Sequence, residues 1–418
     1  MKLFFQFCRF FVLLPLLLLV YGCDQKEILY EYKAKVPVFE KMASIRKMDV
    51  SVVSPKPLTT SGKIYLYKDY LFINEPNEGI HILDNKNPSN PISISFLEIP
   101  GNVDLAVNNG ILYADSYVDL LTFDLNNPTQ PNLLERLEDV FESQYVYHYL
   151  SGGNEKVVVV DYKDTIINST SSNVYFPFST SDKIYYANSS ESTGNQNYGV
   201  GGSMARFTLA NEHLYTVNNT SLHLFDVGNP RKPVFVKDIP LGWGIETIFP
   251  YKGNLFIGST TGMHIYNISQ PAEPNKLSVY THFTACDPVV VNDDYAFVTL
   301  RSGNICGLAN DVLEVIDIRD LTAPKLLKTF SMQNPHGLGL SEDVLYICEG
   351  DFGFKSFNVS DISTIDRNLL EHLKDMKSTD VIPGPKSLIV VGKDGVCQYD
   401  YSNKGKINLL SCISKTVM

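Results

Sequence analysis

Six polar or charged residues each precede a short apolar segment, and the intervals between them are 40–49 residues apart from one interval of 102. They are Asp104, Arg206, Glu246, Asp287, His336 and Asp380. If the fold brings them together, their carboxylates could hold a divalent cation, because Asp and Glu supply hard oxygen ligands. The same groups could bind a polar ligand, or two carboxylates could perform general acid and base chemistry.

The apolar segments belong to a repeated unit of an apolar strand, a tight turn and a second apolar strand ending in Asp or Asn. Seven copies of the second strand are present, at residues 80–84, 120–124, 222–226, 263–267, 313–317, 354–358 and 396–400. Polar turns containing Asn-Pro follow several copies, and proline there ends a strand because it fixes φ and lacks a donor. A strand-built repeat of this length predicts an all-β fold, a β-propeller of four-stranded blades.

The spacing of the copies predicts the number of blades. Asp84 and Asp124 are 40 residues apart, whereas Asp124 and Asp226 are 102 apart. Two repeats fit that gap and leave residues over for a polar insertion at about 165–202. We label the four strands of a unit a to d in chain order, from the innermost to the outermost, so that the repeated hairpin consists of strands b and c. Residues 156–161 would supply strand b of the additional unit. We therefore predict eight blades, with seven as the alternative if this unit is a loop.

The N-terminus has the features of a secretion signal. Lys2 and Arg9 accompany an apolar run at residues 10–21 that is too short to cross a bilayer. The run continues into Leu-Val-Tyr-Gly-Cys, which resembles a bacterial lipobox with Cys23 as the lipidated residue. The alternative is an ordinary cleaved signal and a soluble periplasmic protein. We predict a lipoprotein signal peptide at 1–22, an anchor and linker at 23–60, and a propeller domain at 61–418.

The residues after Cys23 are Asp-Gln-Lys-Glu, which resemble the sequence that directs many Gram-negative lipoproteins to the outer face of the outer membrane. We expect lipid attachment to the bacterial outer membrane and surface exposure, with the periplasmic face as the alternative. Loss of Lys2 and Arg9 with the signal changes the net charge from -11 to -13. Because no basic stripe is present, we expect no nucleic-acid binding.

The strand copies, best seen in Leu-Glu-Val-Ile-Asp at 313–317, together with the Asn-Pro turns and the lipobox, resemble the LVIVD-repeat β-propeller lipoproteins. The resemblance covers most of residues 61–413. Residues 263–267 and 354–358 depart from it by ending in Asn. The resemblance implies a cell-envelope scaffold whose molecular activity is not established, so it supplies no catalytic residues. The single tryptophan, Trp243, and the lack of a Trp-Asp pair exclude a WD40 repeat.

In antiparallel blades the start of strand a and the end of strand b lie on the same face, so the six residues should form a ring at one mouth of the central channel. The ends of strand b add Asn74, Glu75, Asp115, Arg301, Glu349 and Lys393. Trp243, beside Glu246, would provide an apolar platform. A plainer interpretation is that a hydrated channel needs a polar lining.

Five cysteines follow the anchor: Cys286, Cys306, Cys348, Cys397 and Cys412. An odd number in an exported protein leaves one unpaired. A Cys286–Cys306 disulfide would pin the insertion at 302–310, and a Cys397–Cys412 disulfide would join adjacent strands of the last blade. The alternative for the second pair is two buried thiols.

No metalloprotease, serine-hydrolase or phosphate-loop motif is present, so we predict no catalytic residues and no cofactor, with a divalent cation as an alternative. The function that we predict is a non-enzymatic binding or scaffold protein, whose partner is a glycan or an envelope protein. The alternative is an extracellular polysaccharide-active enzyme that uses carboxylates at the propeller mouth. Nothing in the sequence indicates the oligomeric state.

Overall fold

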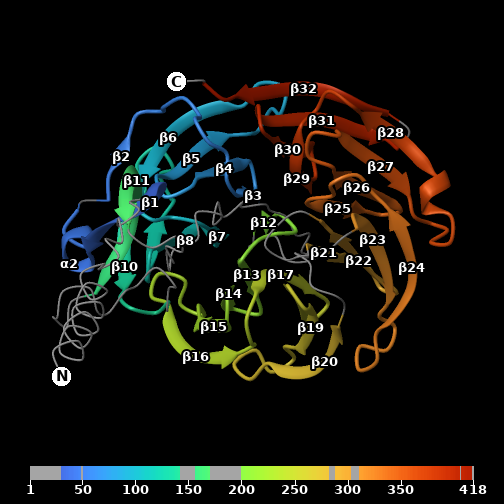
Figure 1. The fold of residues 1–418 in the computed structure, drawn as a ribbon, viewed down its shortest axis with the longest axis horizontal. Helices are drawn as coiled ribbons and strands as arrows, with labels where there is room; N and C mark the ends of the chain where they lie inside the picture. The colour runs from blue at the N-terminus through green and yellow to red at the C-terminus, as the bar shows by residue number, and fades with distance from the viewer. Residues whose placement is uncertain are drawn as a thin grey trace, which may run out of the picture. The chain divides into compact units, whose positions relative to one another are not determined.

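A computed structural model of the protein describes residues 30–48, 50–141, 156–169, 199–281, 288–302, 310–404 and 406–416. The chain divides into two compact units. One unit is a two-stranded sheet of β1 (Tyr30–Lys41) and β11 (Val157–Ser169), in which Lys35 Nζ lies 3.5 Å from Asp164 Oδ1. The other unit, residues 40–158 and 184–418, is a β-propeller whose described residues form seven four-stranded blades around one axis (Figure 1).

The first four blades are built as follows. Blade 1 contains β3 (Ile64–Tyr67), β4 (Tyr70–Glu75), β5 (Gly79–Asp84) and β6 (Ile92–Glu98). Blade 2 contains β7 (Leu105–Asn108), β8 (Ile111–Ser116), β9 (Asp119–Asp124) and β10 (Asn132–Leu137). Blade 3 contains β13 (Phe207–Ala210), β14 (His213–Val217), β15 (Ser221–Asp226) and β16 (Val234–Pro240). Blade 4 contains β17 (Ile245–Tyr251), β18 (Asn254–Ser259), β19 (Gly262–Asn267) and β20 (Asn275–Thr281).

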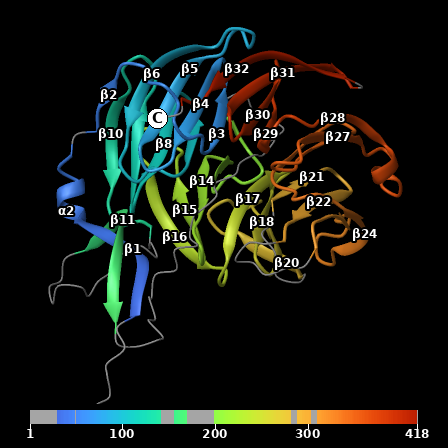
Figure 2. The ribbon, with the colours of Figure 1, turned by 45° about the horizontal axis from the view of Figure 1, so that its top comes forward.

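The last three blades complete the ring. Blade 5 contains β21 (Val289–Val291), β22 (Tyr295–Leu300), β23 (Val312–Asp317) and β24 (Lys325–Ser331). Blade 6 contains β25 (Leu338–Ser341), β26 (Val344–Cys348), β27 (Phe354–Asn358) and β28 (Leu369–Leu373), with the 3-10 turn η1 (Ile365–Arg367) before β28. Blade 7 contains β29 (Ser378–Pro383), β30 (Leu388–Gly392), β31 (Gly395–Asn403) and β32 (Lys406–Ser414). Neighbouring strands of a blade are antiparallel, and Figure 2 shows β3 to β6 side by side.

The prediction of a β-propeller is confirmed, but the preferred count of eight blades is wrong and the alternative of seven is confirmed. We assigned residues 156–161 to strand b of an eighth blade, but 157–161 instead form the start of β11, and β11 pairs with β1. The valine-rich segment at 157–160 satisfies the pattern of an inner strand equally well. Its true partner lies more than a hundred residues upstream, so local spacing did not reveal it.

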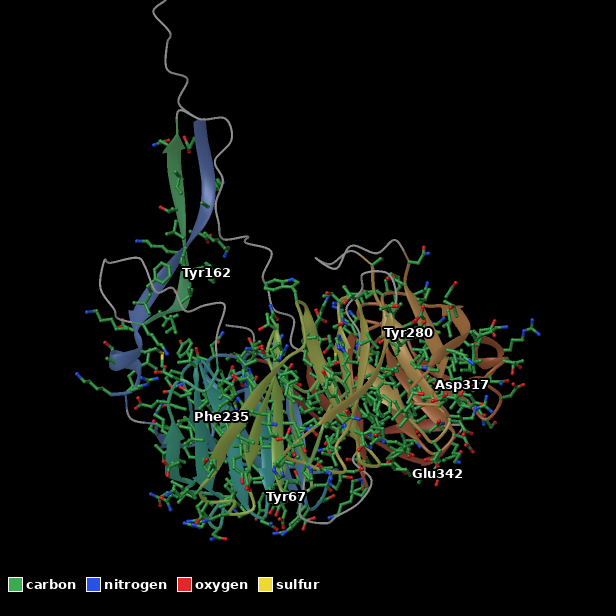
Figure 3. The ribbon with its side chains drawn as sticks, turned by 90° about the horizontal axis from the view of Figure 1, so that it is seen from below. Tyr67, Tyr162, Phe235, Tyr280, Asp317 and Glu342 are labelled. Atoms are coloured by element: carbon green, nitrogen blue, oxygen red, sulfur yellow. A yellow bond between two sulfur atoms is a disulfide. The ribbon has the colours of Figure 1, made fainter. Side chains whose placement is uncertain are left out.

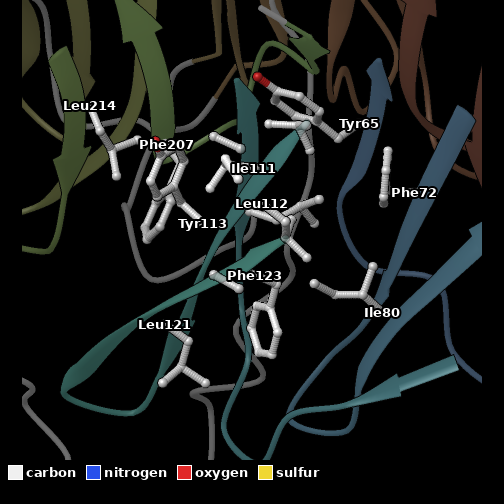
Figure 4. Close-up of a cluster of buried hydrophobic side chains, with 14 of the residues drawn as sticks. Tyr65, Phe72, Ile80, Ile111, Leu112, Tyr113, Leu121, Phe123, Phe207 and Leu214 are labelled. Atoms are coloured by element: carbon white, nitrogen blue, oxygen red, sulfur yellow. The ribbon is translucent and has the colours of Figure 1, made fainter. Parts of the chain in front are cut away.

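The hydrophobic core lies between neighbouring blades, because the middle strands are covered on both faces. The aromatic residue in the middle of strand b is at most 2% exposed in six blades: Phe72, Tyr113, Tyr215, Phe256, Phe297 and Tyr346. Figure 4 shows Phe72 and Ile80 of blade 1 with Tyr113 and Phe123 of blade 2 and Phe207 of blade 3. Burial on both faces explains why strands b and c are short continuous apolar runs.

Each outer strand d carries a β-bulge opposite strand c, in every one of the seven described blades. The additional residue is a branched apolar side chain in each case: Ile94, Leu134, Val236, Leu277, Leu327, Leu370 and Leu410. A bulge twists an edge strand and disfavours pairing with another chain. The repeated bulge therefore protects an outer edge that would otherwise be open.

The Asp or Asn that ends strand c makes the same hydrogen bond in all seven blades. Its Oδ1 accepts the backbone N–H two residues later, over 2.8–3.1 Å, at Asp84, Asp124, Asp226, Asn267, Asp317, Asn358 and Asp400. Only an acceptor oxygen is required, so Asn is equivalent to Asp at this position. We call this face of the propeller, which also holds the turns between strands a and b, the turn end. Tyr67 and Glu342 border such turns, and Figure 3 shows both residues on the lower side of the propeller.

Each blade takes all four of its strands from one continuous stretch of chain, so the ring is not closed by a blade that combines strands from both ends of the chain. Polar contacts between blades 7 and 1 join the ends of the ring instead. The amides of Asn85 and Gln398 pair reciprocally, with N–O distances of 3.0 and 2.6 Å. Ser411 Oγ donates to the carbonyl oxygen of Pro88 over 2.6 Å. A disulfide between Cys397 and Cys412 joins β31 to β32 within blade 7.

The segment before blade 1, which we predicted to be a linker, contributes to the propeller. After α2 (Met42–Ile45), the guanidinium of Arg46 binds both carboxylate oxygens of the fully buried Asp119, over 2.6 and 2.9 Å. β2 (Val52–Val53) then pairs with the outer edge of β6. Among the residues that the structure describes, no helix has the length and apolar character that a membrane span requires.

Candidate functional site

The candidate site is the mouth, which we define as the face opposite the turn end, where each strand a begins. Strand pairing shows that the predicted ring residues do not share one register. In each blade one residue of strand a pairs with the fourth residue of strand b, and we take the residue immediately before it as the reference position. This position is occupied by Lys63 in blade 1, Asp104 in blade 2 and Arg206 in blade 3. Glu246 and His336 lie one residue earlier, and Asp380 one residue later.

Lys63 is the member of this ring that sequence reasoning missed. It lies 41 residues before Asp104, so the repeat spacing could have identified it. Asp287 lies outside the described residues, as do Cys23, Cys286 and Cys306.

Lys63 and Asp104 form an ion pair that is almost fully buried, with 3.1 Å between Nζ and Oδ2. The same oxygen accepts the backbone N–H groups of Arg206 and Phe207, over 2.6 and 3.2 Å. Burial lowers the pKa of Lys63, and the negative charge of Asp104 opposes this shift. Asp104 therefore joins the first three blades, and its carboxylate is already engaged.

The central channel is occupied by the chain itself at the level of the inner strands. β12 (Val200–Gly201) pairs with β3, and Figure 1 shows β12 at the propeller centre. The backbone N–H of Gly199 donates to Val107 over 3.1 Å, and the N–H of Leu338 donates to Ser203 Oγ over 3.1 Å. Residues 199–204 thus contact blades 1, 2 and 6, so part of the channel is filled by the protein chain and not by solvent alone.

The positive charges of three cations act on the partly buried Glu246. Burial raises the pKa of Glu246 to about 7, although the positive charges of Arg206, Arg301 and Lys63 all act to lower it. Arg206 is also partly buried, and no carboxylate among the described residues lies within ion-pair distance of its guanidinium. Because its charge also acts to lower the pKa of Lys63, the guanidinium of Arg206 is close to a second cation. This part of the mouth is suited to an anion.

His336 is held beside Arg301 at the mouth. Nη1 of Arg301 lies 2.8 Å from Nε2 of His336, and Thr299 Oγ1 donates to the His336 carbonyl over 2.6 Å. Burial, together with the charge of Arg301, lowers the pKa of His336 to about 3. The imidazole is therefore neutral at physiological pH.

Several predicted carboxylates are instead used to hold the loops that precede strand a. Asp115 accepts the N–H groups of Val103 and Asp104 over 2.7 and 3.0 Å, and burial raises its pKa to about 7. The fully buried Glu349 accepts the N–H of Gln333 over 3.0 Å and pairs with Lys355 over 2.5 Å.

Glu75 has the corresponding role in blade 1. It accepts the N–H groups of Thr59 and Thr60, each over 3.1 Å, and lies 2.9 Å from Nε2 of His81. Burial acts to raise the pKa of Glu75, but the hydrogen bonds from His81 and Thr59 and the charge of Lys56 hold it well below its usual range. Of the remaining predicted residues, Asp380 is 1% exposed, whereas Lys393 pairs with Asp351 on the surface.

Trp243 is the most exposed large apolar residue of those that the structure describes, with 70% of its surface accessible. It lies in the loop between β16 and β17, between Gly242 at φ +107° and Gly244 at φ +85°. The backbone of this loop is fixed, because the N–H of Gly244 donates to Asn219 over 2.8 Å. A Cβ at Gly244 would lie 2.0 Å from Thr260 Oγ1, so only glycine fits there.

In the part of the chain that the structure describes, no three His, Cys, Asp or Glu side chains are grouped so that they could hold a metal ion. Cys348, the remaining described cysteine, is a buried free thiol whose pKa is raised by burial. The mouth therefore combines the Arg206 guanidinium, which has no ion-pair partner among the described residues, with a carboxyl group whose pKa is near neutrality and an exposed indole.

The fold defines the protein as a seven-bladed β-propeller. Residues 60–96 match the LVIVD repeat, which confirms the resemblance over that stretch. No protein with a curated description matches the sequence. A solved structure from Lactobacillus plantarum is similar, with 12% identity, a TM-score of 0.54, and coverage of 85% of this chain and 97% of that chain.

Two further solved structures cover the same shares of each chain, 85% and 97%, at 10% identity. One is a functionally unknown protein from Desulfotomaculum acetoxidans, with a TM-score of 0.50. The other is the periplasmic gluconolactonase PpgL of Pseudomonas aeruginosa, with a TM-score of 0.53. At these identities the likeness shows the fold alone.

Proposed function

We propose that this protein is a non-enzymatic binding protein that takes a polar ligand at the mouth. Its lipid anchor at Cys23 holds it on the outer membrane at the cell surface. The observation that carries the proposal is the guanidinium of Arg206, which is partly buried near Lys63 without a carboxylate partner among the described residues. A desolvated cation beside another cation is unfavourable until an anionic or strongly polar group binds it.

Binding is favoured over catalysis because most titratable groups near the mouth already have structural partners. Asp104 is engaged by Lys63 and three backbone N–H groups, and Asp115 by the loop before β7. His336, with a pKa of about 3, is too weak a base for proton transfer near neutral pH.

Thermal unfolding of the purified protein in detergent, screened against neutral and acidic glycans, tests ligand binding. We expect at least one ligand to raise the Tm of the unmodified protein, because a ligand that binds only the folded state stabilises it. Arg206→Gln should abolish the shift. Arg231→Gln is the matched control, because Arg231 is an exposed arginine at the turn end of the same blade. An equal shift in Arg206→Gln would place the ligand elsewhere.

The anchor is tested separately in cells. Metabolic labelling with a fatty acid should mark the unmodified protein and not Cys23→Ser, and protease added to intact cells should digest the labelled protein. Labelling that persists in Cys23→Ser would refute lipidation at that residue, and full protease resistance would favour the periplasmic face.

An enzyme acting on extracellular polysaccharide is the second candidate, and the raised pKa of Glu246 is the observation that favours it. A carboxyl group with a pKa of about 7 can donate or accept a proton at neutral pH. The fold is shared with a protein described as a gluconolactonase. Turnover of a glycan by the unmodified protein that is lost in Glu246→Gln would establish catalysis, whereas binding without turnover would establish the first candidate.

A further inference from the structure

We propose that the ligand of the mouth is a carboxylate-bearing sugar of the uronic acid class, whose carboxylate is bound by the guanidinium of Arg206. This inference rests on the proposed binding function and specifies its ligand. It depends on the three cations at the mouth, on how each is already used, and on the exposed indole of Trp243.

Arg206 is the cation that remains available. The ammonium group of Lys63 is engaged by Asp104 over 3.1 Å and by the carbonyl oxygen of Met204 over 2.6 Å. Arg301 contacts the imidazole of His336. The guanidinium of Arg206, by contrast, has neither an ion pair nor a side-chain hydrogen bond with the rest of the described chain.

The backbone of Arg206 is fixed on both sides, which gives its side chain a defined origin. Its N–H donates to Asp104 Oδ2 over 2.6 Å, and its carbonyl oxygen accepts the N–H of Val217 over 2.9 Å. A guanidinium presents a planar pair of N–H donors that matches the two oxygens of a carboxylate. A group positioned in this way is prepared to bind a carboxylate in a bidentate arrangement.

Glu246 is not the permanent counterion of Arg206. Neither carboxylate oxygen of Glu246 lies within ion-pair distance of that guanidinium, although the charge of Arg206 acts on Glu246. Arg301 and Lys63 also act on Glu246, so the local charge is more positive whenever Glu246 is protonated. An incoming carboxylate would therefore be attracted by Arg206 and by its two cationic neighbours.

The sugar is inferred from Trp243. Its indole is 70% exposed although the loop that carries it is held by backbone hydrogen bonds, and the same loop leads directly to Glu246. A rigid exposed aromatic face suits the apolar face of a sugar ring, while the ring hydroxyls remain hydrated. Because residues 199–204 occupy the channel, such a ligand would approach from the mouth.

The matched probes are a galacturonate trisaccharide and its methyl ester, which have the same sugar rings and differ in the charged group. Isothermal titration of the full protein in detergent should detect the acid and give at least tenfold weaker binding of the ester. Arg206→Gln should weaken binding of the acid at least tenfold, and Arg206→Lys should lie between because it keeps the charge and loses the planar fork. Arg231→Gln should bind as the unmodified protein does. Since Arg206→Gln removes an unfavourable, partly buried charge and breaks no side-chain hydrogen bond with another described residue, the Tm of the unliganded variant should not fall.

Equal binding of the acid and the ester, or unchanged binding in Arg206→Gln, would overturn the inference. Binding of sulfated sugars without uronates would overturn it as well. If a neutral glycan binds and Trp243→Ala abolishes that binding, the ligand class is wrong but the binding function stands. If no charged or neutral glycan binds, both proposals fail.

Discussion

The turn end and the mouth use polar residues in opposite ways. At the turn end the same Oδ1 to N–H bond recurs in all seven blades, and its two partners are only two residues apart. At the mouth the equivalent position holds Lys63, Asp104, Arg206, Thr247 and Gly337 in five different blades. A polar residue that recurs with a local partner serves the fold, whereas residues that differ from blade to blade can form a site.

Asp104 is an exception to this contrast between the turn end and the mouth, because it lies at the mouth and yet holds three blades together. Asp104→Ala would leave the buried ammonium of Lys63 without its counterion and would free three backbone N–H groups. Removing one partner of a buried ion pair costs about 3–5 kcal/mol. We expect the free energy of unfolding, measured by denaturant titration, to fall by that amount.

Asp104→Asn is the matched control, because it removes the charge and keeps one of the two acceptor oxygens, while a donor amide nitrogen replaces the other. It should be less destabilising than Asp104→Ala. If Asp104→Ala unfolds like the unmodified protein but loses its ligand, Asp104 would belong to the binding site and not to the scaffold.

The division also explains what could be predicted from the sequence. The strand c copies ending in Asp or Asn revealed the propeller, because each blade repeats them with local partners. The blade count was wrong because residues 156–161 have the composition of an inner strand but pair with β1, a non-local choice. The approximate ring positions followed from spacing, but the register did not, because Glu246 and His336 are each displaced by one residue. The buried ion pair between Glu349 and Lys355 could likewise not be predicted from the sequence.

The disulfide of blade 7 should act on the scaffold without changing the mouth. Cys397 and Cys412 are 15 residues apart, and a cross-link of that span stabilises by about 3 kcal/mol in the chain-entropy model. We expect Cys397→Ala with Cys412→Ala to lower the free energy of unfolding by about that amount, measured without reductant. Affinity for a mouth ligand should be unchanged. A loss of affinity with unchanged stability would contradict the separation of the two regions.

Ligand affinity should depend on pH through Glu246. Below pH 7 Glu246 is protonated, so its negative charge no longer offsets the attraction of an anionic ligand to Arg206, Arg301 and Lys63. As the pH rises through about 7, Glu246 ionises and repels a carboxylate, so affinity should fall. The change is about tenfold for each unit by which the bound ligand raises the pKa of Glu246.

Titrations of galacturonate trisaccharide at pH 6 and pH 8 measure this dependence, and Glu246→Gln should bind equally at both values. Asp115→Asn provides the comparison, because Asp115 has a pKa in the same range but contacts the loop before β7. A pH dependence that disappears in Asp115→Asn and persists in Glu246→Gln would assign the titration to the scaffold carboxyl group.

The smallest effect is expected at the turn end, where Asp226 isolates the recurring bond. Its Oδ1 accepts the N–H of Gly228 over 2.8 Å, and it has no ion pair with another described residue, unlike Asp124 or Asp317. Asp226→Ala should lower the free energy of unfolding by about 1 kcal/mol, the usual net value of one hydrogen bond. Asp226→Asn should be neutral, because Asn267 and Asn358 already make this bond in two blades. Destabilisation by Asn equal to that by Ala would show that the charge, and not the acceptor oxygen, is what the repeat retains.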